Sequence, residues 1–61
     1  MKIVVFDNKT FEVLAAVYTD GISITRNDIS FQTYGDDVEP VFTEVDNKII
    51  LNANAVIYER L

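Results

Sequence analysis

The chain has 61 residues, with ten acids, five bases, no cysteine and no histidine, and its formal net charge is −5. A chain this short is expected to form one domain, residues 1–61, and to bury only about 60% of the surface that its unfolded form exposes. The composition excludes disulfides and zinc sites made of thiolates or imidazoles. The acid excess opposes direct binding to nucleic acid or to an anionic membrane.

The hydropathy pattern predicts a soluble protein. One lysine and a short apolar run, Ile3 to Phe6, follow the first residue, and that run is too short for a signal peptide. No stretch approaches the length of a membrane span. We therefore expect a cytoplasmic protein that makes no membrane contact.

The first third of the chain alternates between β-forming runs and turn signals. Lys2 to Asp7 contains consecutive β-formers, which predicts a strand covered on both faces. Residues 7–10, Asp-Asn-Lys-Thr, predict a turn. Phe11 to Thr19 predicts a second strand, although residues 12–16 also have helical propensity.

The middle of the chain repeats this alternation. Asp20-Gly21 predicts a type I′ hairpin turn that leads into a third strand, Ile22 to Thr25. Ile29 to Tyr34 predicts a fourth strand with one dry face and one wet face. Gly35 to Pro40 predicts the longest break between strands, and Pro40 is expected in a loop or at a strand start, because proline cannot donate a ladder hydrogen bond.

The last third predicts two or three more strands. In a strand from Val41 to Val45, the odd positions are expected to face the core, and Phe42, Glu44 and Asp46 to lie opposite them. A turn at residues 46–48 leads to a strand from Ile49 to Asn52. A weaker turn signal at 52–54 then precedes a last strand or short helical tail, Val56 to Arg60.

The overall expectation is an all-β domain of six to seven short strands, arranged as an antiparallel meander, a sandwich or a small barrel-like, curled sheet. Closed barrel and open sheet both fit the strand spacing. An open meander leaves two edges that can pair with another chain. A homodimer formed by edge-strand pairing is therefore one expectation, and a monomer is the other.

The acidic residues gather in one part of the chain. No base lies between Arg26 and Lys48, whereas six acids do. The plain interpretation is a solvated surface that keeps a small protein soluble. The functional interpretation is a carboxylate patch with an aromatic centre, which binds a basic protein by imitating nucleic-acid phosphates. The residues expected to bind this partner are Tyr34, Asp36, Asp37, Glu39, Phe42, Glu44 and Asp46.

Metal binding and catalysis are both expected to be absent. The acidic segment lacks the spacing of a calcium loop, and the ligands that Ca²⁺ or Mg²⁺ needs do not converge in it. The serines have no histidine to activate them, and so short a chain can hardly enclose a pocket for paired carboxylates. We expect no cofactor and no enzymatic activity.

In composition the chain is similar to small accessory proteins of phages and mobile elements, which are short, acidic, rich in β-structure and free of cysteine. No motif carries this likeness, so it assigns no residue a role. Two functions remain after these exclusions. One is a small acidic inhibitor or regulator that blocks a basic, nucleic-acid-binding surface. The other is a structural or assembly component, for instance one encoded by a phage, that acts through sheet edges or an apolar face.

Overall fold

The computed structural model describes residues 1–58, which form five strands in two antiparallel sheets. The all-β expectation is confirmed, but there are fewer strands than predicted and the sheets do not close into a barrel. One sheet has the strand order β2-β1-β3, and the other is the hairpin of β4 and β5. The strands are β1 (Lys2–Asp7), β2 (Val13–Tyr18), β3 (Ile29–Tyr34), β4 (Val38–Val45) and β5 (Lys48–Tyr58).

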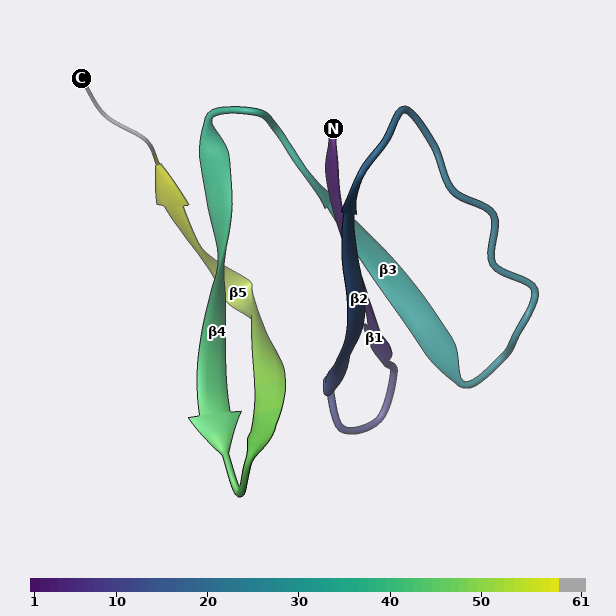
Figure 1. Cartoon of the computed structure of the whole chain (residues 1–61), viewed down its shortest axis with the longest axis vertical. Coiled ribbons are helices and arrows are strands. Elements are labelled where there is room, and N and C mark those ends of the chain that lie inside the picture. Colours follow the sequence, from purple (N-terminus) through teal and green to yellow (C-terminus); the bar gives the residue numbers. More distant parts are fainter. Residues whose placement is uncertain (59–61) are drawn as a thin grey trace.

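Strand β1 is the centre of the fold. It pairs with β2 along one edge and with β3 along the other. Its four apolar residues, Ile3 to Phe6, are only 1 to 8% exposed, as predicted for a strand covered on both faces. Val4 and Phe6 join the core with Leu51 of the hairpin. Figure 1 shows the three-stranded sheet edge-on, with the hairpin on one side and the connection between β2 and β3 on the other.

The strand order corrects the expected meander. β2 and β3 lie on opposite sides of β1, so residues 19–28 between them form a crossover loop and not a hairpin. The predicted type I′ turn at Asp20-Gly21 is wrong, because Gly21 does not adopt the positive φ that such a turn requires. The predicted strand Ile22 to Thr25 is also wrong, because these residues lie in the crossover loop. Burial still follows hydrophobicity in this loop: Ile22 is half-buried, whereas its neighbour Ser23 is exposed.

The connection between β1 and β2 matches the turn predicted there. The Asp7 Oδ1 atom accepts hydrogen bonds from the backbone N–H groups of Lys9 and Thr10, at 2.8 and 3.0 Å. Phe11 ends the turn with φ = 66°, an unusual value for a bulky residue. Phe11 therefore lies outside β2, and its ring stacks on Phe6 at 5.1 Å between centroids. The helical alternative for residues 12–16 is wrong, since β2 begins at Val13.

The β4–β5 hairpin turns at Asp46 and Asn47, whose φ angles are 51° and 66°. Two consecutive positive φ values are the signature of the type I′ hairpin turn, which confirms the turn predicted there. The predicted loop through Pro40 is wrong in part, since β4 begins at Val38. Proline is tolerated because the β4–β5 register shifts directly after it.

Strand β5 continues through the turn predicted at residues 52–54. Val41 pairs with Asn52 and Pro40 with Val56, so residues 53–55 bulge out of the ladder. The predicted last strand is therefore the end of β5, which runs to Tyr58. The remainder of that prediction, residues 59–60, lies outside the described residues.

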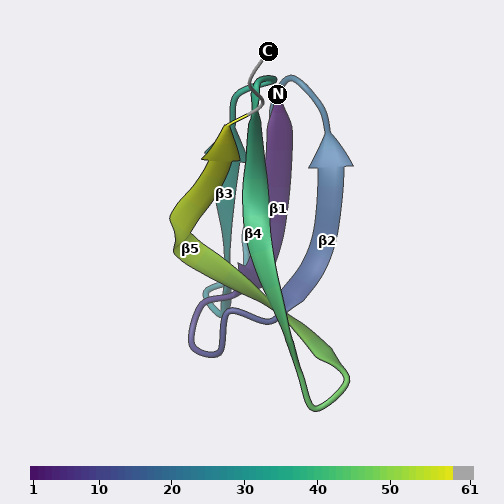
Figure 2. The same ribbon diagram turned by 90° about the vertical axis from the view of Figure 1, so that its left-hand side faces the viewer.

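Among residues 1–58, the backbones of the two sheets meet at one junction. Glu12 forms an isolated antiparallel bridge with Ile50, and the Leu51 N–H donates to the Phe11 carbonyl at 2.8 Å. The hairpin thus crosses the end of β2 and packs over the face of β1, as Figure 2 shows. The result is a curled pair of sheets with open edges.

Candidate functional site

The β4–β5 hairpin projects past the end of the three-stranded sheet. In Figures 1 and 2 the turn between β4 and β5 extends lower than the ends of β1, β2 and β3. Every residue from 42 to 49 is exposed, and we call this segment the hairpin tip. Three large apolar side chains lie on it: Phe42 is 42% exposed, Val45 47% and Ile49 44%.

The register separates the charges of the hairpin tip. Phe42 lies opposite Leu51, and Glu44 lies opposite Ile49. Directly opposed residues share a face, so Glu44, Phe42 and Ile49 lie on one face of the hairpin. Lys48 opposes Val45 on the other face. We call Phe42, Glu44 and Ile49, together with Asp46 in the turn, the acidic hairpin face.

This arrangement corrects the predicted orientation of β4. Val41, Thr43 and Val45 were expected to face the core, but the buried Leu51 shows that the face of Phe42 is the inner one. Phe42 is nevertheless exposed, because the hairpin tip extends beyond the sheet that would cover it. Ile49 was not among the residues predicted for the site. The two-residue turn at 46–47 is the signal that would have placed it opposite Glu44.

The remaining acids lie at the other end of β4. Asp36 and Asp37 belong to the turn between β3 and β4, and Glu39 lies in the first part of β4. An eight-residue strand is about 23 Å long at 3.3 Å per residue. The carboxylates therefore form two separate groups, one at each end of β4.

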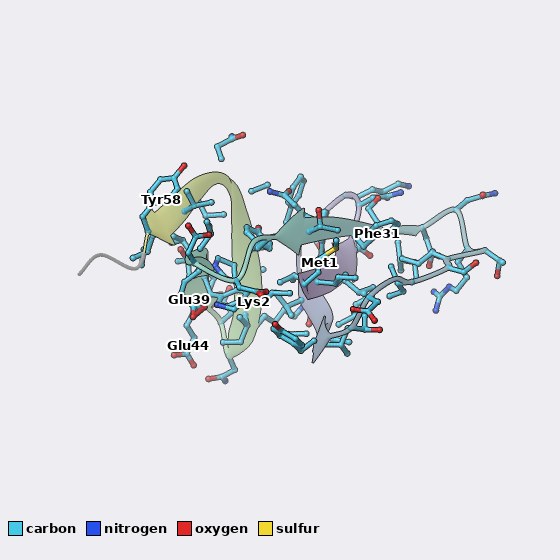
Figure 3. All side chains as sticks on the ribbon, turned by 90° about the horizontal axis from the view of Figure 1, so that it is seen from above. Met1, Lys2, Phe31, Glu39, Glu44 and Tyr58 are labelled. Carbon is cyan, nitrogen blue, oxygen red and sulfur yellow. The ribbon has the colours of Figure 1, made fainter. Side chains whose placement is uncertain are left out.

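The group near the β3–β4 turn is partly neutralised by the start of the chain. Lys2 Nζ lies 2.8 Å from Glu39 Oε1 and donates to the Val38 carbonyl at 3.2 Å. The N-terminal amine lies 3.6 Å from Asp36 Oδ1. Figure 3 shows Lys2 and Glu39 side by side.

Asp36 also contacts an aromatic side chain of the central sheet. A hydrogen bond to the Asp36 carboxylate raises the pKa of the Tyr18 hydroxyl, because the phenolate would lose that bond and lie beside a negative charge. These contacts tie Asp36 to the ends of β1 and β2. Asp36 and Glu39 thus already have structural partners within the chain.

Tyr34 lies in the core, where it packs with Val4, Phe6 and Leu51 and is only 4% exposed. Burial raises the pKa of its hydroxyl. That hydroxyl has no hydrogen-bond partner among the described residues. A side chain so placed cannot contact a partner protein without a rearrangement, so Tyr34 is left out of the proposed contact surface.

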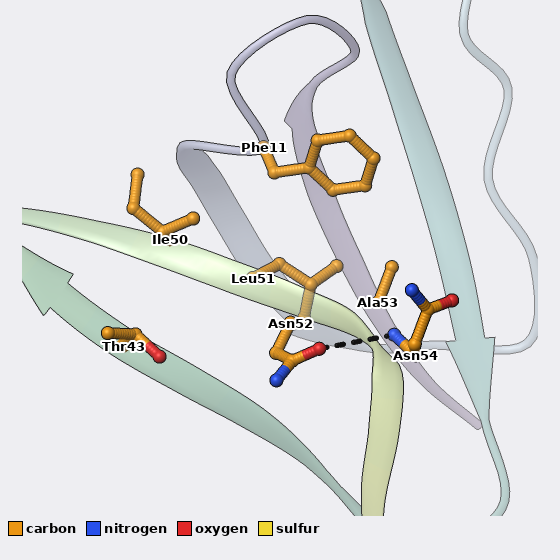
Figure 4. A pocket seen from close by; sticks show the side chains of 7 residues that line it. All are labelled: Phe11, Thr43, Ile50, Leu51, Asn52, Ala53 and Asn54. Carbon is orange, nitrogen blue, oxygen red and sulfur yellow. Dashed lines mark hydrogen bonds between the residues drawn. The ribbon is translucent and has the colours of Figure 1, made fainter.

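A hollow of about 360 Å³ lies where the two sheets meet (Figure 4). Phe11, Ile50, Leu51 and Ala53 form its apolar wall. The sequence did not predict it, because it depends on the positive φ of Phe11 and on the bulge in β5. Its polar rim consists of Thr43, Asn52 and Asn54.

Within residues 1–58, no group of three or more histidine, cysteine or acidic side chains is arranged to hold a metal ion. The same residues contain no helix of the length and apolarity needed to cross a membrane. Comparisons of the chain with protein-family models, with curated proteins and with solved structures found no match. Function therefore has to be inferred from the residues and their geometry.

Proposed function

We propose that the protein is a non-enzymatic protein-binding module whose acidic hairpin face docks on a basic surface of a partner protein. The observation that supports this proposal is the projection of the hairpin tip, which presents exposed Phe42 and Ile49 beside Glu44 on one face. Exposed apolar side chains that gather on one surface mark interaction sites, whereas single scattered ones do not. A contact surface that buries them on binding accounts for their position.

The chemistry of the acidic hairpin face suggests the kind of partner. Apolar and aromatic side chains at the centre of an interface supply most of its affinity, while charges at the rim steer encounter and set specificity. Glu44 and Asp46 can pair with lysine or arginine, and Lys48 points to the other face. A nucleic-acid-binding groove concentrates such bases, so we propose that the protein occupies one and blocks it.

A second function, assembly, is favoured by the small size of the core. Among the described residues, six hydrophobic side chains are buried, whereas eleven large ones are at least 38% exposed. Several of these lie far from the hairpin tip, such as Leu14 on β2 and Phe31 on β3. A component of a larger complex would cover them permanently, and its association would depend little on salt.

The test is a pull-down from native host lysate at low and high salt, read by mass spectrometry. It compares the wild-type protein with the double variants E44Q/D46N and D36N/D37N. Each double variant removes two of the ten acids, so the net charge rises from −5 to −3 in both. Asn is well suited to the positive φ of position 46, so the turn is retained.

The proposal predicts capture of a basic, nucleic-acid-binding protein that is lost at high salt. E44Q/D46N should weaken this capture by about tenfold, as expected for the loss of close charge pairs, and D36N/D37N should have little effect. Equal losses in both variants would show that only the overall charge matters. Capture that ignores salt and both variants would favour assembly.

A further inference from the structure

The edges of the two sheets differ in how they are protected against pairing. β4 contains Pro40 and two glutamates, and the bulge in β5 disrupts its ladder. β3 is uncharged, but only two of its six residues are exposed, and the side chain of Gln32 donates to the Ala53 carbonyl of β5 at 3.3 Å. β2, Val-Leu-Ala-Ala-Val-Tyr, has no charge, proline or glycine, and five of its six residues are exposed. An uncharged, exposed edge of this kind favours strand addition.

The backbone hydrogen bond at the end of β2 shows which backbone groups of this strand are free to pair. The Thr19 N–H donates to the Met1 carbonyl at 3.0 Å, so position 19 faces β1. The facing direction alternates along an antiparallel strand. Ala15 and Val17 therefore also face β1, and Ala16 and Tyr18 direct their N–H and C=O groups outward. The regular part of the edge begins at Ala15, since the β1–β2 register shifts before it.

We infer that β2 pairs antiparallel with β2 of a second copy of this chain, about a two-fold axis that passes between the two Val17 residues. In this register Ala16 of each copy lies opposite Tyr18 of the other. Each such pair exchanges both of its outward hydrogen bonds. The result is a continuous six-stranded sheet with the order β3-β1-β2-β2-β1-β3.

The side chains of β2 fit this self-pairing. Val17 meets the second copy's Val17, and Ala16 lies beside the second copy's Tyr18, so no like charges are opposed. Glu12 lies outside the pairing, because β5 already occupies the backbone there through the Phe11 carbonyl. A net charge of −5 keeps copies apart elsewhere, and the uncharged β2 offers the approach with least repulsion.

The occupant is a second copy because both partners then use the same unprotected edge, as an isologous interface requires. An interface formed by one short strand from each copy belongs to the weak class, in which the dimer forms only at high protein concentration. The dimer does not rest on the proposed function of the hairpin. Either proposal can be contradicted without the other, because the experiments change residues on different strands.

The first experiment uses the absence of cysteine from the chain. Val17 and Thr33 both pair with Ile3, so they lie at matched positions on the two opposite edges of the same sheet. In the proposed dimer, the two Val17 residues form a non-hydrogen-bonded pair with Cα atoms about 4.5 Å apart, which suits a disulfide. Under mild oxidation, V17C should form a covalent dimer at least about tenfold faster than T33C. Equal rates would overturn the proposal.

The second experiment is sedimentation of the wild-type protein and of V17K over a wide concentration range. The wild-type protein should dimerise at high concentration, whereas V17K should remain monomeric because two lysines would oppose each other across the axis. Mixing V17K with V17E should restore a dimer. A wild-type protein that stays monomeric at millimolar concentration would overturn the inference. So would a V17K variant that dimerises as well as wild type and gives the native circular dichroism spectrum.

Discussion

Strand β1 and the hairpin tip are both rich in apolar residues, yet one is buried and the other exposed. Ile3 and Val4 are 1 and 2% exposed, whereas Val45 and Ile49 are 47 and 44% exposed. The difference comes from position: β1 has a neighbouring strand on each edge and a covered face on each side, while the tip extends beyond the sheet. Hydrophobicity alone therefore does not place a residue in this core. The exposed tip is the surface that we propose a partner covers.

The largest expected effect on stability comes from comparing two residues on the same face of β5. Leu51 is 2% exposed in the core, and Ile49 lies two positions away on the hairpin tip. L51A should lower the free energy of unfolding by about 2–5 kcal/mol, since it leaves a cavity. I49A should lower it by less than about 0.5 kcal/mol, as expected for a surface position. Urea denaturation measures both, and comparable losses would show that the tip is structural.

The turn of the hairpin tip gives the next largest effect. Asn47 adopts φ = 66°, a conformation that glycine adopts freely and β-branched residues avoid. N47V should therefore destabilise the protein by about 1–2 kcal/mol, the cost of a left-handed conformation. N47G should leave stability unchanged or raise it slightly. If N47V proves neutral in thermal denaturation, the type I′ turn is not maintained in solution.

The sequence predicted the parts of the fold that depend on neighbouring residues. The Asp7 turn, the Asp46-Asn47 turn and the doubly covered β1 all follow from local residue types, and the structure contains all three. The strand order could not be predicted in this way. β2 has two edges, and nothing in its own residues says that β1 occupies one and leaves the other free.

The same limit applied to the candidate site. The sequence places six acids between Arg26 and Lys48, but their separation along β4 depends on where the strand begins and ends. Tyr34 was expected in the contact patch because it lies in phase with Ser30 and Gln32, on the face of the strand expected to be partly exposed. It is buried because the hairpin folds back over the face of β1, a long-range contact that no local pattern contains.

The core around β1 contains one buried polar group whose hydrogen-bonding capacity is not satisfied. The buried Tyr34 hydroxyl has no partner among the described residues, and an unsatisfied buried group is unfavourable for folding. Y34F should therefore raise the free energy of unfolding by about 1 kcal/mol. Calorimetry of the two proteins measures the change. A less stable Y34F would mean that the hydroxyl is hydrogen-bonded in solution.

The smallest expected effect is a loss of stability at acid pH. Hydrogen bonds from the Thr10 and Lys9 backbone lower the pKa of Asp7 below 3.8, and a hydrogen bond from Arg26 lowers the pKa of Asp28. A lowered pKa stabilises the fold above the unfolded value, and this contribution is lost as the pH falls through the folded value. Stability should therefore decline below pH 3.8.

The variant D7N isolates the contribution of Asp7. Its amide oxygen can still accept the turn hydrogen bonds, but it does not titrate, so D7N should lose less stability than wild type between neutral and acid pH. D37N, with the same change in net charge, is the control. Denaturation as a function of pH measures the slopes, and a D7N slope equal to that of wild type would contradict the assignment.

The most direct measurement is amide hydrogen exchange of the protein, alone and bound to the basic protein that the pull-down is expected to recover. If the hairpin tip is the contact surface, the amides of residues 42–49 should gain protection on binding. Those of residues 35–39, at the other end of β4, should not change. Protection at residues 35–39 with none at the tip would contradict the proposed function.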